Sequence, residues 1–253
     1  MTLHEAIKER KSVRTYTGEA PSSSIMSQIR EFAQQVGSVL PNRHARAVVI
    51  DREVDGKIGT YGFIRKAAGF VAIVQKGNEA LDAVNAGMAG EKLVLQLTTI
   101  GIGTCWLGGT FSHGEVARMV NPEQDEHIAA IIAYGYAATR EYMGARLMAS
   151  LVGARKRKPF ESLFEVDSNC QCHAALESMR LAPSSSNSQP WRVVEQGGDF
   201  HFFCVEKRKL NLLDMGIGMF HFAICDSAGK WIIDEGAAAL RPDWTYILTR
   251  NLK

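Results

Sequence analysis

Apolar side chains recur three and four positions apart in several parts of the chain, which is the spacing of one face of an α-helix. The clearest stripes lie in residues 23–37 and 78–100. Thr2 and Ser112 each precede a shorter segment of this kind and carry hydroxyl groups suited to a helix N-cap. The pattern therefore predicts helices at 3–11, 23–37, 78–100, 112–119, 170–181 and 210–226.

Short apolar runs between these segments predict β-strands. Residues 70–74 (FVAIV) form an unbroken apolar run, which favours a strand buried on both faces. Residues 101–111 (GIGTCWLGGTF) are predicted as a glycine-rich loop. The remaining strands are predicted at 47–50, 127–136, 191–195, 200–205 and 244–249. Helices and short strands in this order indicate an α+β fold, which we expect to have mixed or antiparallel sheets with flanking helices.

The order of predicted elements in residues 22–106 recurs later in the chain as helix, loop, strand, strand, helix. Local strings are also similar: EAPSSSIMSQ (19–28) resembles LAPSSSNSQP (181–190), and DAVNAGMAGE (82–91) resembles LLDMGIGMFH (212–221). We interpret this as a diverged internal duplication, with a first half at 1–160 and a shorter second half at 161–253. Chance similarity between short strings rich in serine and glycine is the alternative.

Composition narrows the function classes. A chain of 253 residues with 46% hydrophobic and 22% charged residues is typical of a folded globular protein with a sizeable core. A net charge of +2 argues against a dedicated nucleic-acid-binding protein. No run reaches the 18 or so apolar residues of a membrane span, and the N-terminal residues lack a secretory signal pattern. We therefore expect a cytoplasmic protein with neither a membrane nor a nucleic acid as partner.

The five cysteines are odd in number and scattered, so they do not form a disulfide framework. Cys170 and Cys172 lie beside His173, which resembles part of a metal site. No second cluster lies at a zinc-ligand spacing, and we predict no metal.

Two basic strings are candidates for phosphate binding. In residues 10–14 (RKSVR), guanidinium groups can bind phosphate oxygens in pairs and a serine can donate a further hydrogen bond. In residues 153–159 (GARKRKP), adjacent cations repel one another unless an anion lies among them. A solvated helix end and an exposed basic loop are the alternatives. The candidate residues are Arg10, Lys11, Ser12, Arg14, Arg155 and Arg157.

Two other strings suit a flat polar ligand. Residues 182–191 (APSSSNSQPW) present hydroxyl and amide groups on a loop stiffened by two prolines. In residues 101–109, the final glycines let backbone N–H groups approach a ligand closely. Plain turn chemistry and a helix C-cap are the alternatives, and packing is the alternative for the tryptophans. The candidate residues are Trp106, Leu107, Gly108, Gly109, Pro183, Ser184, Ser185, Asn187 and Gln189.

Taken together, RKSVR, GIGTCWLGG, RKRKP and APSSSNSQPW resemble the motifs of the flavin-dependent nitroreductase family over most of the chain. The resemblance implies FMN as the cofactor, NAD(P)H as the electron donor, and a small, flat, electron-poor acceptor such as a nitroaromatic or a quinone. It implies ping-pong electron transfer through flavin N5 with no obligatory acid or base, so no catalytic side chain is predicted. The chain lacks a GxGxxG dinucleotide fingerprint, which also favours FMN over FAD.

One departure from the family pattern concerns the PSSxN loop. In the family this loop follows soon after the RxSxR motif, but residues 21–28 here lack the asparagine and the QPW, and the intact loop lies in the second half. Family members are typically homodimers with FMN at the subunit interface. The resemblance therefore implies a single-chain pseudo-dimer with one complete flavin site between its halves, a lost mirror-related site, and no need for a second chain.

Two functions remain open at this stage. The first is an NAD(P)H-dependent, FMN-containing oxidoreductase of the nitroreductase type, of which dehalogenation and azoline oxidation are variants. The second is a non-catalytic flavin-binding or interaction protein that has kept the fold.

Overall fold

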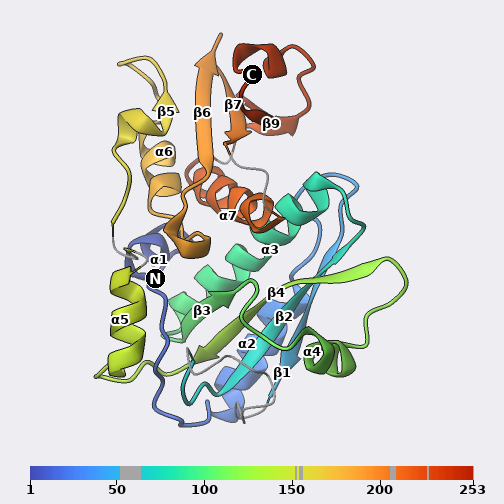
Figure 1. Cartoon of the computed structure of the whole chain (residues 1–253), viewed down its shortest axis with the longest axis vertical. Coiled ribbons are helices and arrows are strands. Elements are labelled where there is room, and N and C mark those ends of the chain that lie inside the picture. The colour runs from blue at the N-terminus through green and yellow to red at the C-terminus, as the bar shows by residue number, and fades with distance from the viewer. Residues whose placement is uncertain (52–63, 152, 154–155, 206–208, 227, 253) are drawn as a thin grey trace.

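The computed structural model describes residues 1–51, 64–151, 153, 156–205, 209–226 and 228–252. These residues form two β-sheets with two long helices between them (Figure 1). The predicted α+β class is confirmed.

The first sheet has the strand order β1-β2-β4-β3, and every neighbouring pair is antiparallel. Its centre is β2, which is buried along almost its whole length, as the unbroken apolar run predicts. The prediction of a loop at 101–111 is wrong for its first part, because residues 103–107 pair with β4 as an edge strand. The strands are β1 (Ala45–Ile50), β2 (Gly69–Lys76), β3 (Gly103–Leu107) and β4 (Glu126–Gly135).

The second sheet has the order β5-β6-β7-β9-β8. The short β5 runs parallel to β6, and the other pairs are antiparallel. Gly197 and Gly198 join β6 to β7 in a two-residue turn with φ values of 62° and 86°, which side chains disfavour. The strands are β5 (Phe164–Glu165), β6 (Trp191–Gln196), β7 (Asp199–Cys204), β8 (Lys230–Ile232) and β9 (Thr245–Asn251).

Apart from β5, the two sheets have the same topology. A helix precedes the first strand, a long helix joins the second strand to the third, and a short helical segment joins the third to the fourth. These pairs are α2 (Ser23–Gln34) and α6 (His173–Arg180), α3 (Ala80–Thr99) and α7 (Lys209–Cys225), and α4 (His113–Val120) and η3 (Ala237–Leu240). This repeated order supports the predicted duplication.

The topology corrects one part of the proposed repeat. Residues 21–28 are not the counterpart of the loop at 181–190, because they begin α2, with Ser22 as its N-cap. The position that matches the loop between α6 and β6 is the loop between α2 and β1, at residues 35–44. The similar strings at 19–28 and 181–190 therefore occupy different places in the two halves.

The long helices α3 and α7 pack against each other between the sheets (Figure 1). They meet at Gly87 and Gly216, where a Cβ atom on either residue would overlap a backbone oxygen of the opposite helix. The two glycines thus let the helix backbones approach more closely than side chains would allow. This crossing joins the two halves through the centre of the molecule.

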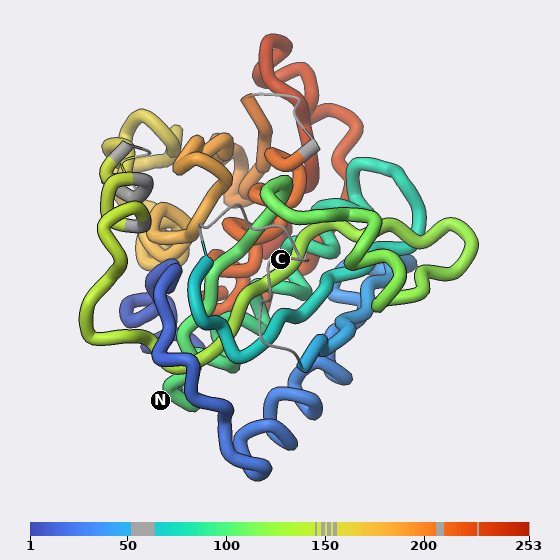
Figure 2. Tube along the Cα trace, turned by 60° about the horizontal axis from the view of Figure 1, so that its bottom comes forward, coloured from blue at the N-terminus to red at the C-terminus, as the bar shows by residue number. Residues whose placement is uncertain are grey.

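Helical segments at the beginning and at the end of the first half have no counterpart in the repeated order. Helix α1 (Leu3–Glu9) begins at Thr2 in a capping box with Glu5, which confirms Thr2 as an N-cap. The Ser112 side chain makes no such cap bond at α4, although Ser112 occupies the N-cap position. After β4 the chain runs along one side of the molecule, through α5 (Met143–Leu151) and η1 (Phe160–Ser162), to reach the second sheet as β5 (Figures 1 and 2).

Candidate functional site: a cavity between the two halves

A cavity of about 570 Å³ lies between the two halves of the chain. This volume is in the range of pockets that bind small molecules or cofactors. Most of the residues predicted from the sequence motifs line it: Arg10, Lys11, Ser12, Arg14, Trp106, Leu107, Gly108, Gly109, Arg157, Pro183, Ser184, Ser185 and Asn187. Arg155 lies outside the described residues, and Gln189 does not line the cavity.

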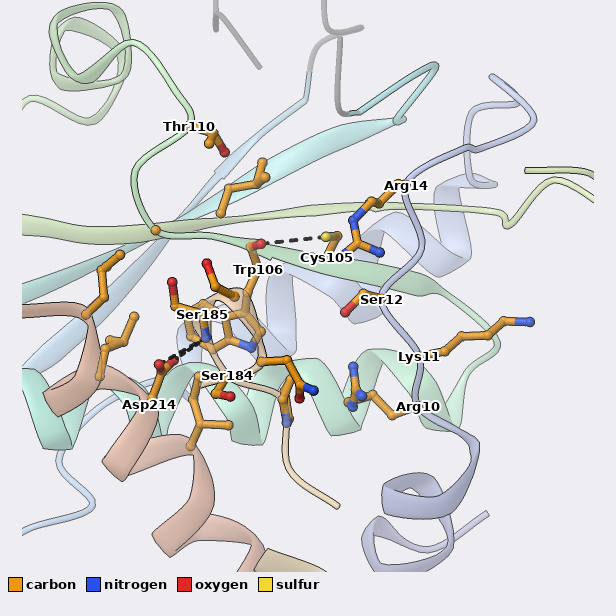
Figure 3. Close-up of a pocket in the computed structure, with 18 of the residues that line it drawn as sticks. Arg10, Lys11, Ser12, Arg14, Cys105, Trp106, Thr110, Ser184, Ser185 and Asp214 are labelled. Carbon is orange, nitrogen blue, oxygen red and sulfur yellow. Dashed lines mark hydrogen bonds between the residues drawn. The ribbon is translucent and has the colours of Figure 1, made fainter. Parts of the chain in front are cut away.

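The segment 10–14 reaches the cavity because it is extended. Helix α1 ends at Glu9 with Arg10 as its C-cap. The chain then runs beside β3, where the N–H of Val13 donates to the Thr104 carbonyl at 2.8 Å. In extended backbone, alternate residues face the same side. Arg10, Ser12 and Arg14 therefore face the cavity while Val13 enters the core, and the Lys11 side chain points away (Figure 3).

The arginines at this end of the cavity are poorly compensated. Burial lowers the pKa of the Arg10 guanidinium, a shift that the Glu91 charge partly opposes. Burial also lowers the pKa of Arg157, and repulsion from Arg10 lowers it further. Within the described part of the chain, the buried Nε of Arg10 has no hydrogen-bond partner. An anion bound here would offset the repulsion between the two guanidinium groups and could accept a hydrogen bond from the Arg10 Nε.

The loop at 184–189 is strained and firmly held. Ser186, Asn187 and Gln189 have φ values of 50°, 55° and 48°, in the left-handed region that residues other than glycine rarely adopt. The Ser184 hydroxyl accepts a hydrogen bond from the Gln189 N–H at 3.0 Å, and the Gln189 Oε1 accepts one from the Lys158 N–H at 2.8 Å. Gln189 therefore holds the loop from behind.

Asn187 has a similar bracing role. Its side-chain amide donates to the carbonyl oxygens of Gly153 and Lys156 at 2.8 and 2.9 Å, and its Oδ1 accepts from Arg157 at 3.3 Å. Arg157 also donates to the Leu181 carbonyl at 3.0 Å. The basic string after α5 and the serine-rich loop are thus joined into one wall of the cavity.

The opposite wall is the end of β3 and the turn after it. At Gly108 a Cβ atom would lie 2.6 Å from a methyl carbon of Leu210, so glycine allows β3 to approach α7 closely. At Gly109 a Cβ would meet no atom of the described residues within 4 Å, so contacts among them do not explain this second glycine.

Trp106 connects this wall to a fully buried polar pair. Its Nε1 donates to Glu91 Oε2 at 2.7 Å, and Glu91 Oε1 lies 2.9 Å from Nε2 of His221. Nδ1 of His221 faces the Ser178 carbonyl oxygen at 3.0 Å, and because a carbonyl oxygen only accepts, this contact requires a hydrogen on Nδ1. Glu91 and His221 have no exposed surface and come from different halves. The pair therefore links the two halves and is joined to the cavity lining through Trp106.

Asp214 is a cavity residue that the sequence analysis did not identify. It lies on α7 with 3% of its surface exposed, and both carboxyl oxygens accept the Ser185 N–H at 3.0 Å (Figure 3). Burial raises the pKa of Asp214 to about 7, although the hydrogen bonds from Ser185 and Ser188 act in the opposite direction. A single acid within an apolar helix gives no sequence signal of this role. Thr110 and Glu141 also line the cavity and were not predicted.

The described residues include no group of three or more His, Cys, Asp or Glu side chains placed to bind a metal ion. Burial raises the pKa of the Cys170 thiol to about 11, and the pKa of Cys172 is raised for the same reason.

Across the described ranges, no helix has the length and apolar character needed to cross a membrane.

The fold and the cavity define a two-sheet protein of the nitroreductase fold. A solved structure with this fold is a "putative nitroreductase" from Thermotoga maritima, with a TM-score of 0.66, 22% identity, and coverage of 100% of this chain and 94% of that chain. The sequence model of the family described as "Putative TM nitroreductase" matches residues 2–225, and the chain belongs to this family.

Weaker structural similarities involve part of the chain. A nitroreductase family protein from Clostridium difficile has a TM-score of 0.47 and 15% identity, and the match covers 67% of this chain and 99% of that chain. A "putative nitroreductase in complex with FMN" from Desulfovibrio desulfuricans has a TM-score of 0.43 and 25% identity, with 57% and 94% covered. No curated protein matches the sequence.

Proposed function

We propose that this protein is an FMN-dependent oxidoreductase that transfers electrons from NAD(P)H to a small, flat, electron-poor acceptor such as a nitroaromatic or a quinone. The observation that carries the proposal is the convergence of two arginine strings and a serine-rich loop on one cavity, although the first string (10–14) lies far from the other two segments in sequence. Membership of the nitroreductase family supports the same reaction class.

The donor set of the cavity fits FMN. The unpartnered Nε of Arg10, with Ser12, Arg14 and Arg157 nearby, suits a terminal phosphate. Leu107, Gly108 and Gly109 on one wall, and Pro183, Ser184 and Ser185 on the other, suit a flat ring with polar edges. Asn187 and Gln189 would act on the cofactor through the loop that they hold in place.

When bound, FMN would supply the two-electron chemistry, taking hydride from NAD(P)H and passing electrons to the acceptor. The residues of the chain would bind the cofactor, orient its ring and adjust its electronic properties. Backbone N–H groups at 107–109 would stabilise negative charge that develops on the ring. No side chain is required to act as an acid or base in this scheme, and none is assigned as catalytic.

The proposal extends to the organisation of the chain. We take residues 1–160 and 161–253 as the two members of an internal pseudo-dimer, with one FMN per chain between them. Joining two halves in one chain replaces a bimolecular association by an intramolecular one, which keeps the effective concentration of the partner half high. The cysteines assigned in the described part of the chain are all free thiols, which fits a reducing cytoplasm.

Reconstitution tests the reaction class. The purified protein is incubated with FMN, freed of unbound cofactor, and treated anaerobically with NADH or NADPH. We expect a yellow protein that either donor bleaches and that nitrobenzene or benzoquinone recolours, with FMN rather than FAD released on denaturation. Yellow protein that neither donor bleaches would support the non-catalytic alternative, and failure to retain flavin would overturn the proposal.

Arginine variants test the phosphate assignment. We expect Arg14→Ala and Arg157→Ala each to weaken FMN binding about ten- to hundredfold, because charge-assisted hydrogen bonds contribute about 1.5–3 kcal/mol. Arg118→Ala, on an exposed face of α4, is the matched control and should bind FMN like the parent protein. Fluorescence titration of FMN into each apoprotein measures these affinities, and unchanged affinities in both variants would exclude this phosphate site.

A further inference from the structure

Asp214 stands out when the two halves are compared at matched positions. In the first half, Asn85 on α3 accepts the N–H groups of Val39 and Leu40 at 2.9 Å and so holds the loop between α2 and β1. In the second half, Asp214 on α7 accepts the Ser185 N–H and holds the loop between α6 and β6. Each residue lies two positions before the glycine of the helix crossing, so the two are structural counterparts.

Holding the loop does not require a charge. The amide oxygen of Asn85 performs this task in the first half while it is fully buried. A carboxylate at the same place is costly to bury, as the raised pKa of Asp214 shows. The two counterparts also differ in position relative to the cavity: Asp214 lines it, whereas Asn85 is not among its lining residues. The acid is therefore placed where a ligand meets it.

The position of Asp214 in the cavity indicates what its charge does. It lies across the cavity from the segment that carries Arg10, Ser12 and Arg14 (Figure 3). Its neighbours on α7 that also line the cavity, Leu213 and Ile217, are apolar. If FMN binds as proposed, with its phosphate at the arginine end, its ring lies towards Asp214. An acceptor must contact that ring to take electrons from it, so it would enter the same end of the cavity and meet the Asp214 carboxylate.

We propose that Asp214 is a specificity-determining residue that admits neutral flat acceptors to its end of the cavity and rejects aromatic carboxylates and sulfonates. This inference rests on the proposed function, because it concerns the acceptor of the same site. The discrimination is electrostatic: an anionic substituent next to a buried carboxylate experiences repulsion that water screens poorly.

A matched pair of probes tests the proposal. 4-Nitrobenzamide and 4-nitrobenzoate have nearly the same shape and differ in charge. Their dissociation constants are measured at pH 8 from the change in flavin absorbance of the oxidised holoprotein, with no reductant present. We expect the parent protein to bind the amide at least about tenfold more tightly than the carboxylate, since close like charges differ by this order.

Two substitutions at this position separate charge from loop anchoring. Asp214→Asn keeps the acceptor for the Ser185 N–H, as Asn85 does in the first half, and should remove most of the discrimination. Asp214→Glu keeps the charge and should retain it. Asn85→Asp, which adds an acid away from the cavity, should leave the ratio of the two dissociation constants unchanged.

The outcomes distinguish this inference from the proposed function. Equal discrimination in the parent protein and in Asp214→Asn, with FMN still bound and still bleached by NAD(P)H, would overturn the role of Asp214 alone. Loss of FMN binding by the parent protein would overturn the proposed function itself. If Asp214→Asn and Asp214→Glu both bind the two probes with equal affinity, the role of Asp214 would be limited to holding the loop.

Discussion

The first and second halves of the chain share a scaffold but differ in what they bring to the cavity. Both have the same order of four antiparallel strands, a preceding helix, and a long helix that crosses its counterpart at a glycine. The first half contributes the arginines of segment 10–14 and the end of β3. The second half contributes the serine-rich loop and Asp214.

The comparison separates two kinds of feature: those that each half requires in order to fold, and those that the two halves supply together to the cavity. The sheets and the helix crossing are required on both sides, because each half packs against the other along α3 and α7. The polar groups around the cavity are divided between the halves. This division supports the proposal that a single chain builds one complete site between its halves.

The largest expected effect comes from breaking the buried link between the halves. His221→Ala removes the hydrogen-bond partner of Glu91 Oε1. Among the described residues, the hydrogen bond that then remains to this fully buried carboxyl group comes from Trp106. Removing one partner of a buried charged pair typically costs about 3–5 kcal/mol, and we expect a loss of this size in the free energy of unfolding. Urea denaturation followed by circular dichroism measures it.

A double variant provides the control. Replacing both Glu91 and His221 by leucine removes the buried charge together with its partner, so we expect a smaller loss than in His221→Ala. A loss below about 1 kcal/mol in His221→Ala, less than a single lost hydrogen bond would produce, would contradict the account of this pair.

A smaller effect is expected at the helix crossing. Gly216→Ala places a Cβ atom against the Val84 carbonyl of α3, a backbone group that moves only with its helix. Overpacking of this kind costs about 1–3 kcal/mol. Gly114→Ala is the matched control, because a Cβ at Gly114 in α4 meets no atom within 4 Å in the part of the chain that the structure describes. It should stabilise the protein by about 0.5–1 kcal/mol, and equal thermal stability of the two variants would argue against the close crossing.

The smallest effect concerns an ion pair confined to the first sheet. Arg46 on β1 binds Glu126 on β4 through two hydrogen bonds of 2.7 and 2.6 Å, which lower the pKa of Glu126 to about 2. Because the folded pKa lies below the ordinary value of 4.5, this stabilisation is present above pH 4.5 and is lost as the pH falls towards 2. Solvent contact of Arg46 limits it to about 1 kcal/mol.

Denaturation at two pH values tests this ion pair. We expect Arg46→Met to lower the stability at pH 7 by about this 1 kcal/mol and to have little effect near pH 2. Arg118→Met, which removes an exposed pair with Glu115, should leave stability unchanged at both values. An equal loss at both pH values in Arg46→Met would indicate lost packing of the side chain in place of lost charge interaction.

Strong periodicity allowed most of the fold to be predicted. The stripes of α2, α3 and α7 and the apolar runs of β2 and β4 contain enough apolar residues to show their period. The edge strand β3 was missed because its sequence, GTCWL, lies within a glycine-rich string. The two-residue β5 is too short to show a pattern, and it is a strand only through its pairing with β6.

The lining of the candidate site was predictable where the residues concerned are close together in sequence. Arg10, Ser12 and Arg14 are spaced for an extended segment, and their placement follows from that spacing. Asp214 was not predictable, because its partner Ser185 is 29 residues away and only the fold brings them together. The repeat was aligned incorrectly at 19–28 because Pro-Ser-Ser serves a helix start there and a strained loop in the second half.

The most direct test of the central claim is complementation between two defective chains. One chain carries Arg10→Ala with Arg14→Ala, and the other carries Ser184→Ala with Asn187→Ala. If one FMN is bound between the two halves of a single chain, each variant binds FMN weakly and their mixture binds no better than the sum of the two, while the parent protein binds one FMN per chain. Tight FMN sites that form only on mixing would show that the cavity is completed by a second chain, and would contradict the account.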